Sequence, residues 1–214
     1  MKTVIISGGN IEYDFALGFL KKESYDYLLA VDKGMEFTFK AGLVPDEILG
    51  DFDSVNREVG QYYKEQRILL SQYNPVKDYT DMELALRTAI ERGSTEIMVL
   101  GATGTRIDHV LGSISNLSIP LENHVECCLL DSHNRIRMTD HNLVIKKEKQ
   151  YGKYVSLLAF GGEVKNLELK GFCYEVEGFT LRPDTSRGIS NEIAKPQAEI
   201  RFDSGRLIVI ESRD

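Results

Sequence analysis

The sequence predicts an α/β protein: a mostly parallel N-terminal sheet with crossover helices, followed by a small antiparallel β-sandwich domain. Two observations carry this prediction. In the first part, short apolar runs alternate with helical patterns, which is typical of parallel strands joined by helices. In the second part, strand-like segments follow one another with Gly, Asn and Asp between them and no helical pattern. We place the boundary between residues 135 and 136, next to the polar, turn-prone segment 131–134.

Six apolar runs in the first part are expected to form strands. They cover residues 4–6, 27–31, 47–49, 68–70, 96–100 and 125–130. Helical patterns follow at 14–22, 80–92 and 107–118. Because strands alternate with helices, the crossover connections are expected to place the carboxyl ends of the parallel strands along one edge of the sheet.

The second part is expected to be an antiparallel sandwich or barrel. Its strand-like segments are 142–146, 154–160, 163–169, 172–181, 197–202 and 206–210. Residues 172–177 alternate with period two, as one half-buried strand would.

The charge of the chain argues against a nucleic-acid partner. The 214 residues include 26 Lys and Arg and 33 Asp and Glu, a formal net charge of −7. Proteins that grip phosphate backbones usually carry a basic excess. The acidic excess lies wholly in residues 1–135, which hold 13 basic and 21 acidic side chains.

Cysteine use and hydropathy bear on the location of the protein. The three cysteines, two of them adjacent (Cys127 and Cys128), are too few for a disulfide scaffold. The N-terminal apolar run is too short for a signal peptide, and no run is long enough to span a membrane. We therefore expect a cytoplasmic protein without a membrane partner.

Six aspartates share one position in the pattern, at the carboxyl end of a predicted strand or in the loop that opens the next helix. Ligands bind at this edge of an open parallel sheet, and loops distant in sequence meet there. The six are Asp32, Asp51, Asp53, Asp78, Asp81 and Asp108.

Two short segments could supply a metal site. Asp51 and Asp53 stand at i and i+2 after Gly50, so on an extended stretch both carboxylates point the same way and can share one hard cation such as Mg²⁺. The alternative is a turn whose polar side chains cap the following helix. Asp78 could be the third carboxylate, or an ordinary helix N-cap.

Two glycine-containing turns could bind phosphate. Residues 101–109 place glycines between a strand and a helix, where backbone N–H groups and the forked donor Arg106 suit phosphate oxygens. Residues 7–10 form a second such turn at the same edge. The alternatives are a surface salt bridge for Arg106 and a packed or capping imidazole for His109. Carboxylates that can bind Mg²⁺, together with hydrogen-bond donors that can bind phosphate oxygens, indicate phosphoryl or nucleotidyl transfer.

These segments, taken in order, resemble the motifs of the thiamine pyrophosphokinase family. The resemblance rests on Ala30-Val31-Asp32-Lys33-Gly34, Gly50-Asp51-Phe52-Asp53-Ser54, Asp78-Tyr79-Thr80-Asp81, Gly104-Thr105-Arg106-Ile107-Asp108-His109 and Ser190-Asn191-Glu192. It implies that the hydroxyl of thiamine attacks the β-phosphorus of ATP, giving thiamine diphosphate and AMP. It also implies Mg²⁺ dependence and a homodimer.

The resemblance also assigns roles to residues. It makes Asp51, Asp53 and Asp78 metal ligands, and it places Asp51, Asp53, Asp78 and Asp81 in the catalytic centre. The nucleotide and phosphate site would contain Asp32, Thr80, Arg106, Asp108 and His109. Ser190 and Asn191 would meet thiamine, within a domain 136–214 for thiamine binding and dimerisation that follows a nucleotide- and Mg²⁺-binding catalytic domain 1–135. The chain has no Trp to pack on thiamine, so Tyr174 or Phe179 could take that place.

Two other functions remain open from the sequence. One is a related pyrophosphokinase that acts on another small alcohol, such as a hydroxymethyl-pterin. The other is a non-catalytic nucleotide sensor, which would not need the aspartates as metal ligands.

Overall fold

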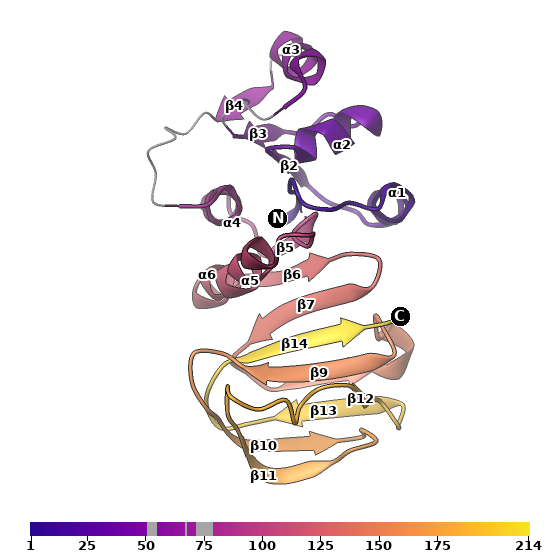
Figure 1. Cartoon of the computed structure of the whole chain (residues 1–214), viewed down its shortest axis with the longest axis vertical. Coiled ribbons are helices and arrows are strands. Elements are labelled where there is room, and N and C mark those ends of the chain that lie inside the picture. The colour runs from indigo at the N-terminus through magenta and orange to yellow at the C-terminus, as the bar shows by residue number, and fades with distance from the viewer. Residues whose placement is uncertain (51–54, 67, 72–78) are drawn as a thin grey trace. The chain divides into compact units, whose positions relative to one another are not determined.

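The computed structural model describes residues 1–50, 55–66, 68–71 and 79–214 (Figure 1). The chain separates into two compact units, Met1–Ser132 and His133–Asp214. No helix in the described ranges is both long enough and apolar enough to cross a membrane.

The first unit is built on parallel strands in the order β6-β5-β1-β2-β3-β4. The strands are β1 (Lys2–Ile6), β2 (Tyr27–Val31), β3 (Glu47–Leu49), β4 (Leu69–Ser71), β5 (Glu96–Leu100) and β6 (Glu126–Leu130). The helices are α1 (Tyr13–Lys22), α2 (Gly34–Lys40), α3 (Arg57–Glu65), α4 (Asp81–Glu91), α5 (Ile107–Asn116) and α6 (Ser118–Glu122). The parallel α/β prediction is therefore confirmed.

The strand order determines where a ligand can enter. The strands β2, β3 and β4 follow one another on one side of β1. The chain then crosses back, and β5 pairs with the other side of β1. Such a reversal opens a crevice at the carboxyl ends of the two strands that diverge from it, here β1 and β5. Central residues such as Ile5 and Val99 are fully buried, as is usual for parallel strands covered on both faces.

The second unit is an antiparallel sandwich. One group of strands runs β12-β9-β14-β7 and the other β11-β10-β13-β8. Their bounds are β7 (Asn134–Thr139), β8 (Leu143–Lys146), β9 (Tyr154–Ala159), β10 (Val164–Lys170), β11 (Val176–Leu181), β12 (Asn191–Glu192), β13 (Gln197–Arg201) and β14 (Leu207–Ser212), with a 3-10 turn at Lys147–Lys149. Apolar side chains of both groups, such as Leu157 and Ile200, share one buried core, so the sandwich prediction is confirmed.

Three local predictions were wrong or incomplete. Residues 134–139 form β7, where the polar composition indicated only a turn-prone boundary. Residues 172–175 are not part of a strand, because Gly171 N–H donates to the Glu175 carboxylate and closes a loop before β11. The helices α2 and α3 were not predicted, although Val59 and Tyr63 of α3 are buried one turn apart.

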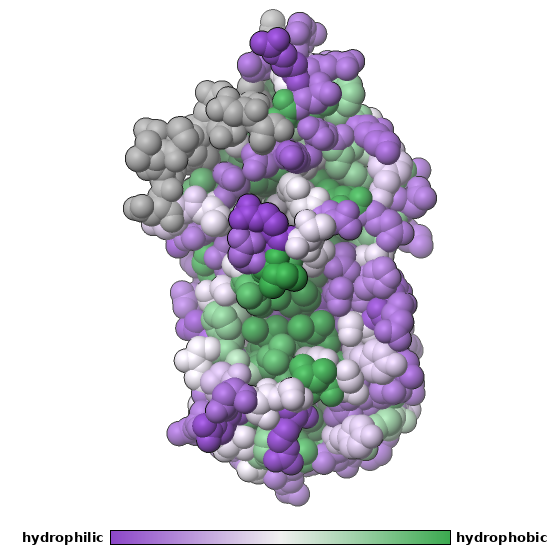
Figure 2. Space-filling view, viewed as in Figure 1, coloured by the Kyte–Doolittle hydropathy of each residue, from purple (hydrophilic) through white to green (hydrophobic). Residues whose placement is uncertain are grey.

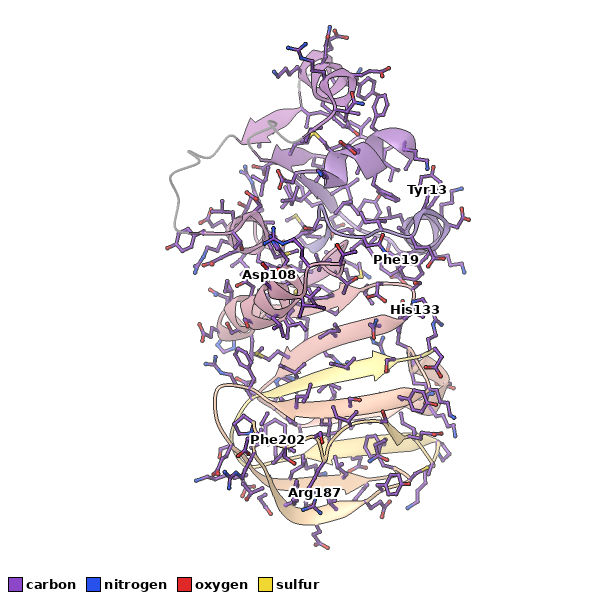
Figure 3. All side chains as sticks on the ribbon, in the orientation of Figure 1. Tyr13, Phe19, Asp108, His133, Arg187 and Phe202 are labelled. Carbon is purple, nitrogen blue, oxygen red and sulfur yellow. The ribbon has the colours of Figure 1, made fainter. Side chains whose placement is uncertain are left out.

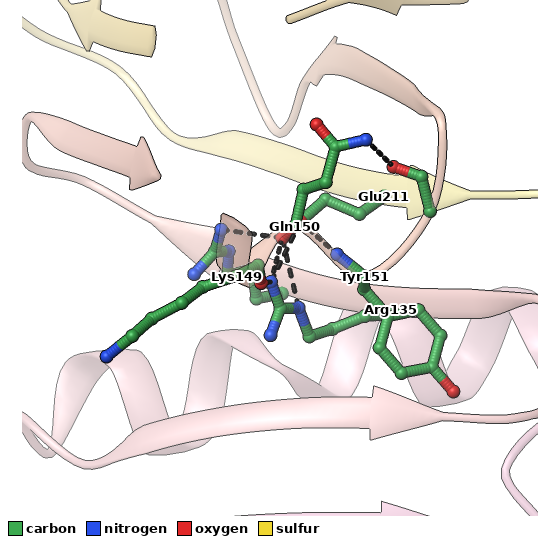
Figure 4. A network of polar contacts seen from close by, with 7 residues as sticks. Arg135, Lys149, Gln150, Tyr151 and Glu211 are labelled. Atoms are coloured by element: carbon green, nitrogen blue, oxygen red, sulfur yellow. Dashed lines mark hydrogen bonds and ion pairs between the residues drawn. The ribbon is translucent and has the colours of Figure 1, made fainter. Parts of the chain in front are cut away.

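A buried ionic network holds β7 against β14. The Glu211 side chain is fully buried and accepts hydrogen bonds from Arg135 at 2.7 Å, from Arg137 at 2.8 Å and from the backbone N–H of Tyr151 at 2.9 Å (Figure 4). Arg135 stands directly opposite Glu211 in the ladder. A buried carboxylate is tolerated only when it is paired in this way.

Candidate active site

Two glycine turns form one continuous backbone surface at the ends of β1 and β5. The N–H of Gly9 donates to the carbonyl of Gly101, and the N–H of Asn10 donates to that of Thr103, both at 2.8 Å. A Cβ on Gly9 would lie 2.3 Å from the Gly101 oxygen. Gly101 itself has a φ of 74°, which favours glycine. The sequence predicted a glycine turn after each strand, and the structure brings the two turns together at the strand-order reversal.

Asp32 lies at the same edge, directly after β2. Its backbone is left-handed, with a φ of 52°, and its N–H donates to the carbonyl of Leu49 at 2.9 Å. A Cβ placed on Gly50 would be 3.1 Å from Oδ1 of Asp32, so this carboxylate lies against the end of β3. Aspartate tolerates the left-handed region better than most residues, and such strain is common at functional sites.

The three predicted metal ligands, Asp51, Asp53 and Asp78, all lie outside the described residues. Within the described ranges, no three His, Cys, Asp or Glu side chains form a group that could hold a metal ion. Asp32, which contacts Gly50 immediately before Asp51 in the chain, adds a hard oxygen donor of the type that Mg²⁺ prefers. Asp32 is thus a described carboxylate at this edge whose chemistry suits a hard cation.

The start of α4 carries two further predicted residues. Thr80 is the N-cap, and its Oγ1 accepts from the N–H of Glu83 at 3.3 Å. Asp81 is exposed in the first turn, where its charge favours the helix dipole. Asn116 at the end of α5 approaches the Thr80 hydroxyl at 3.5 Å, so α5 ends beside the start of α4.

Arg106 and Asp108 form an exposed two-point ion pair at the start of α5. Arg106 Nε and Nη2 donate to the Asp108 carboxylate at 3.2 and 2.6 Å, and both side chains are about two-thirds exposed. This hydrogen bonding lowers the pKa of Asp108 and raises the pKa of Arg106. The N–H of His109 also donates to Asp108 at 3.0 Å. Figure 3 shows Asp108 at this end of α5.

Ser190 and Asn191 lie in the second unit. Ser190 has a φ of 58°, and its N–H donates to Oγ of the buried Ser156 at 3.0 Å. Asn191 is buried and binds the backbone of Tyr174 through both ends of its side-chain amide. Asn191 therefore holds the loop that carries Tyr174, whose side chain is 74% exposed.

Two details of this region had no signal in the sequence. Ser156 lies within the apolar strand β9, where nothing distinguishes it from a packing residue. The two aromatic candidates for thiamine also differ in exposure. Phe179 packs on the core, with the guanidinium of Arg187 4.9 Å from its ring centre, whereas Tyr174 is exposed.

Comparisons with known proteins agree with these observations. The family model "Thiamin pyrophosphokinase, catalytic domain" matches residues 20–129, and "Thiamin pyrophosphokinase, vitamin B1 binding domain" matches residues 140–207. Thiamine pyrophosphokinase of Bacillus subtilis (strain 168) is 31% identical over 217 residues, with 100% of both chains covered.

Solved structures give the same result. The crystal structure of thiamine pyrophosphokinase from Bacillus subtilis superposes with a TM-score of 0.90 at 29% identity, covering 100% of both chains. That of thiamin pyrophosphokinase from Geobacillus thermodenitrificans gives 0.85 at 28% identity, covering 100% of this chain and 98% of the other. The chain belongs to the thiamine pyrophosphokinase family.

Proposed function

We propose that the protein transfers the pyrophosphoryl group of ATP to the hydroxyl of thiamine, giving thiamine diphosphate and AMP. The observation that carries the proposal is the meeting of the two glycine turns at the strand-order reversal, in a chain of this family. Glycines at such a reversal let the backbone come close to an anionic polyphosphate.

The reaction requires one displacement at phosphorus. The thiamine oxygen forms a bond to the β-phosphorus, the bond from that phosphorus to the oxygen bridging to the α-phosphate breaks, and AMP leaves with that oxygen. The hydroxyl proton is lost to solvent or to a nearby carboxylate. Catalysis of this kind depends mainly on positioning and charge neutralisation.

Mg²⁺ is part of the proposal. When bound, the ion would neutralise phosphate charge. We propose Asp51, Asp53 and Asp78 as its ligands, since their pattern in the sequence suits a hard cation. Asp81 would complete the catalytic carboxylates at the start of α4.

The phosphate and nucleotide contacts would come from the loops around β2 and the starts of α4 and α5. We propose Asp32, Thr80, Asp108 and His109 for the nucleotide side. Arg106 would bind a phosphate oxygen through N–H groups of the guanidinium that Asp108 already orients. Ser190 and Asn191 would form the thiamine side, with Tyr174 as the displayed aromatic.

The test is formation of AMP from ATP, assayed with thiamine and Mg²⁺. AMP that appears in step with thiamine diphosphate supports the proposal, and cleavage to ADP without need of thiamine contradicts it. A parallel assay with a hydroxymethyl-pterin as acceptor separates this activity from that of a related pyrophosphokinase. Tight ATP binding with no turnover on any acceptor would indicate a nucleotide sensor.

We also propose a cytoplasmic homodimer, with residues 136–214 as the dimerisation domain that the family resemblance implies and α5 as a further contact. Exposed apolar side chains support an interface on α5, where Ile107 and Leu111 are 66% and 60% exposed one turn apart. Figure 2 shows hydrophobic residues gathered near the middle of the visible face. Three free thiols, at Cys127, Cys128 and Cys173, suit a reducing compartment. Sedimentation of the wild type against Leu111→Ser tests the dimer, and unchanged association of the variant would exclude this face.

A further inference from the structure

A buried carboxylate lies at the start of β3, at the opposite end of that strand from Gly50. Glu47 is 1% exposed, and its Oε2 accepts from the Tyr27 hydroxyl at 2.6 Å. Arg92 donates to the same oxygen from Nε at 3.2 Å and from Nη2 at 3.1 Å. Burial and the hydrogen bond to Glu47 raise the pKa of the Tyr27 phenol, and the charge of Glu47 raises the pKa of Arg92.

The contact between Glu47 and Arg92 connects two elements that are far apart in the chain. Glu47 begins the three-residue strand β3, which leads into Gly50. Arg92 is the C-cap of α4, and Thr80 caps the opposite end of the same helix. The ion pair therefore joins the end of α4 opposite Thr80 to the end of β3 opposite Gly50.

A small tilt of α4 at its contact with Glu47 would cause a larger displacement at the opposite end of the helix, where Thr80 and Asp81 lie. The helix α4 has 11 residues, so it is about 16 Å long, and a tilt of about 4° about its last turn moves its first turn by about 1 Å. A displacement of that size is enough to reduce turnover severely in an enzyme that works by positioning. If stability were the only requirement, an apolar side chain at the buried position of Glu47 would stabilise the fold at least as well as the ion pair does.

We propose that Glu47 and Arg92 are positioning residues for pyrophosphoryl transfer, because their ion pair fixes the Thr80–Asp81 end of α4 relative to β3. This inference rests on the proposed function. Neither residue touches a substrate in this role, so its effect should appear on the nucleotide side of the reaction and not on the thiamine side.

Arg87 offers a matched control on the same helix. Its side chain is 46% exposed, against 47% for Arg92, and it binds Glu83 one turn earlier in α4 at 2.8 Å. Arg87→Met and Arg92→Met thus remove the same charge from equally exposed positions. Arg87→Met also removes the contact of the guanidinium with the ring of Tyr79, 5.2 Å from its centre, but only Arg92→Met breaks a contact between α4 and β3.

The experiment measures kcat and the KM values for ATP and thiamine in both variants, the affinity for a non-hydrolysable ATP analogue, and urea unfolding. For Arg92→Met we expect kcat/KM for ATP to fall by about tenfold or more, with weaker binding of the analogue and little change in KM for thiamine. Arg92→Lys should restore part of the loss, and Arg87→Met should behave as the wild type.

Two results would overturn the inference. One is an Arg92→Met enzyme with lower stability but unchanged kinetics, which would leave the ion pair a purely structural role. The other is an equal loss in Arg87→Met. If Arg92→Met fails to fold, Glu47→Gln is measured in the same way, since it keeps the shape of the side chain and removes the charge. A wild type that forms no AMP would refute the proposed function instead, and the analogue affinities would still test the positioning of α4.

Discussion

Tyr174 and Asn191 exchange two hydrogen bonds across 17 residues of chain: the N–H of Tyr174 donates to Asn191 Oδ1 at 3.0 Å, and Asn191 Nδ2 donates to the Tyr174 carbonyl at 2.8 Å. Asn191 also accepts from the N–H of Glu192 at 2.9 Å. The buried amide thus binds the backbone of the loop before β11 as a neighbouring strand would. It thereby fixes the position of Tyr174, whose ring is exposed.

Replacing Asn191 should therefore affect stability and thiamine binding together. Asn191→Ala leaves partly buried backbone groups of Tyr174 and Glu192 without this partner, at a cost of about 1–3 kcal/mol in the free energy of unfolding. The KM for thiamine should rise and the KM for ATP should stay near the wild-type value. Tyr174→Ala, at an exposed position, should reproduce the kinetic effect without the loss of stability. Equal changes in both KM values would contradict the assigned role.

The close contact of the two glycine turns gives a second prediction. In Gly9→Ala the new Cβ would lie 2.3 Å from the Gly101 oxygen, so the turns must separate and nucleotide affinity should fall. Calorimetry with a non-hydrolysable ATP analogue measures this. Gly18→Ala is the control, because nothing lies within 4 Å of its added Cβ and alanine favours a helix interior by about 1 kcal/mol. Normal nucleotide binding by Gly9→Ala would rule out a phosphate role for this backbone surface.

The ion pair at the start of α5 predicts a titration. Hydrogen bonding from Arg106 lowers the pKa of Asp108, so the folded protein holds this carboxylate ionised below the ordinary value of about 3.9. The stabilisation is present above that pH and is lost as the pH falls through the lowered pKa. NMR titration of Asp108 should show the low pKa, and Arg106→Met should return it toward the ordinary value. An unchanged pKa in the variant would show that the pair does not form in solution.

The network around Glu211 should dominate the stability of the second unit. Glu211→Ala leaves Arg135 and Arg137 without their shared carboxylate, and we expect a loss of about 3–5 kcal/mol in the free energy of unfolding. Asp184→Ala breaks the exposed pair with Arg182, whose side chains are 62% and 64% exposed, and should cost less than about 1 kcal/mol. Urea unfolding followed by circular dichroism compares the two variants. Similar losses in the free energy of unfolding would mean that burial does not determine how much these ion pairs stabilise the fold.

Removal of divalent ions tests the proposed carboxylate ligands. EDTA should abolish AMP formation and added Mg²⁺ should restore it. Asp51→Asn should lower kcat by about a hundredfold or more while the thermal unfolding curve stays the same. Magnesium-dependent tightening of ATP-analogue binding should also disappear in the variant. A variant that retains this tightening would exclude Asp51 as a ligand.

The sequence predicted the elements whose physical cause is local. The apolar runs of β1, β2 and β5 and the period of α4 lie where they were expected, because burial on both faces and a 3.6-residue repeat leave clear patterns. The strand β7 was missed because Arg135 and Arg137 make it look polar, and both arginines pair with Glu211, more than 70 residues later.

The same distinction applies to the site. Glycine turns and aspartates after strands are visible in a sequence, since each belongs to a single loop. The hydrogen bond of Gly9 to Gly101, the contact of Glu47 with Arg92 and the support of Tyr174 by Asn191 each join distant segments. Such contacts depend on the completed fold and have no local pattern.

The left-handed backbone of Asp32 implies a trade-off between stability and activity. An L-residue at a φ of 52° costs free energy that glycine would not. A search for thermostable variants would therefore favour Asp32→Gly, and the same change would remove a carboxylate from the edge of the sheet where the nucleotide is proposed to bind. Selection for thermal stability should thus favour glycine at position 32, whereas selection for turnover should favour aspartate.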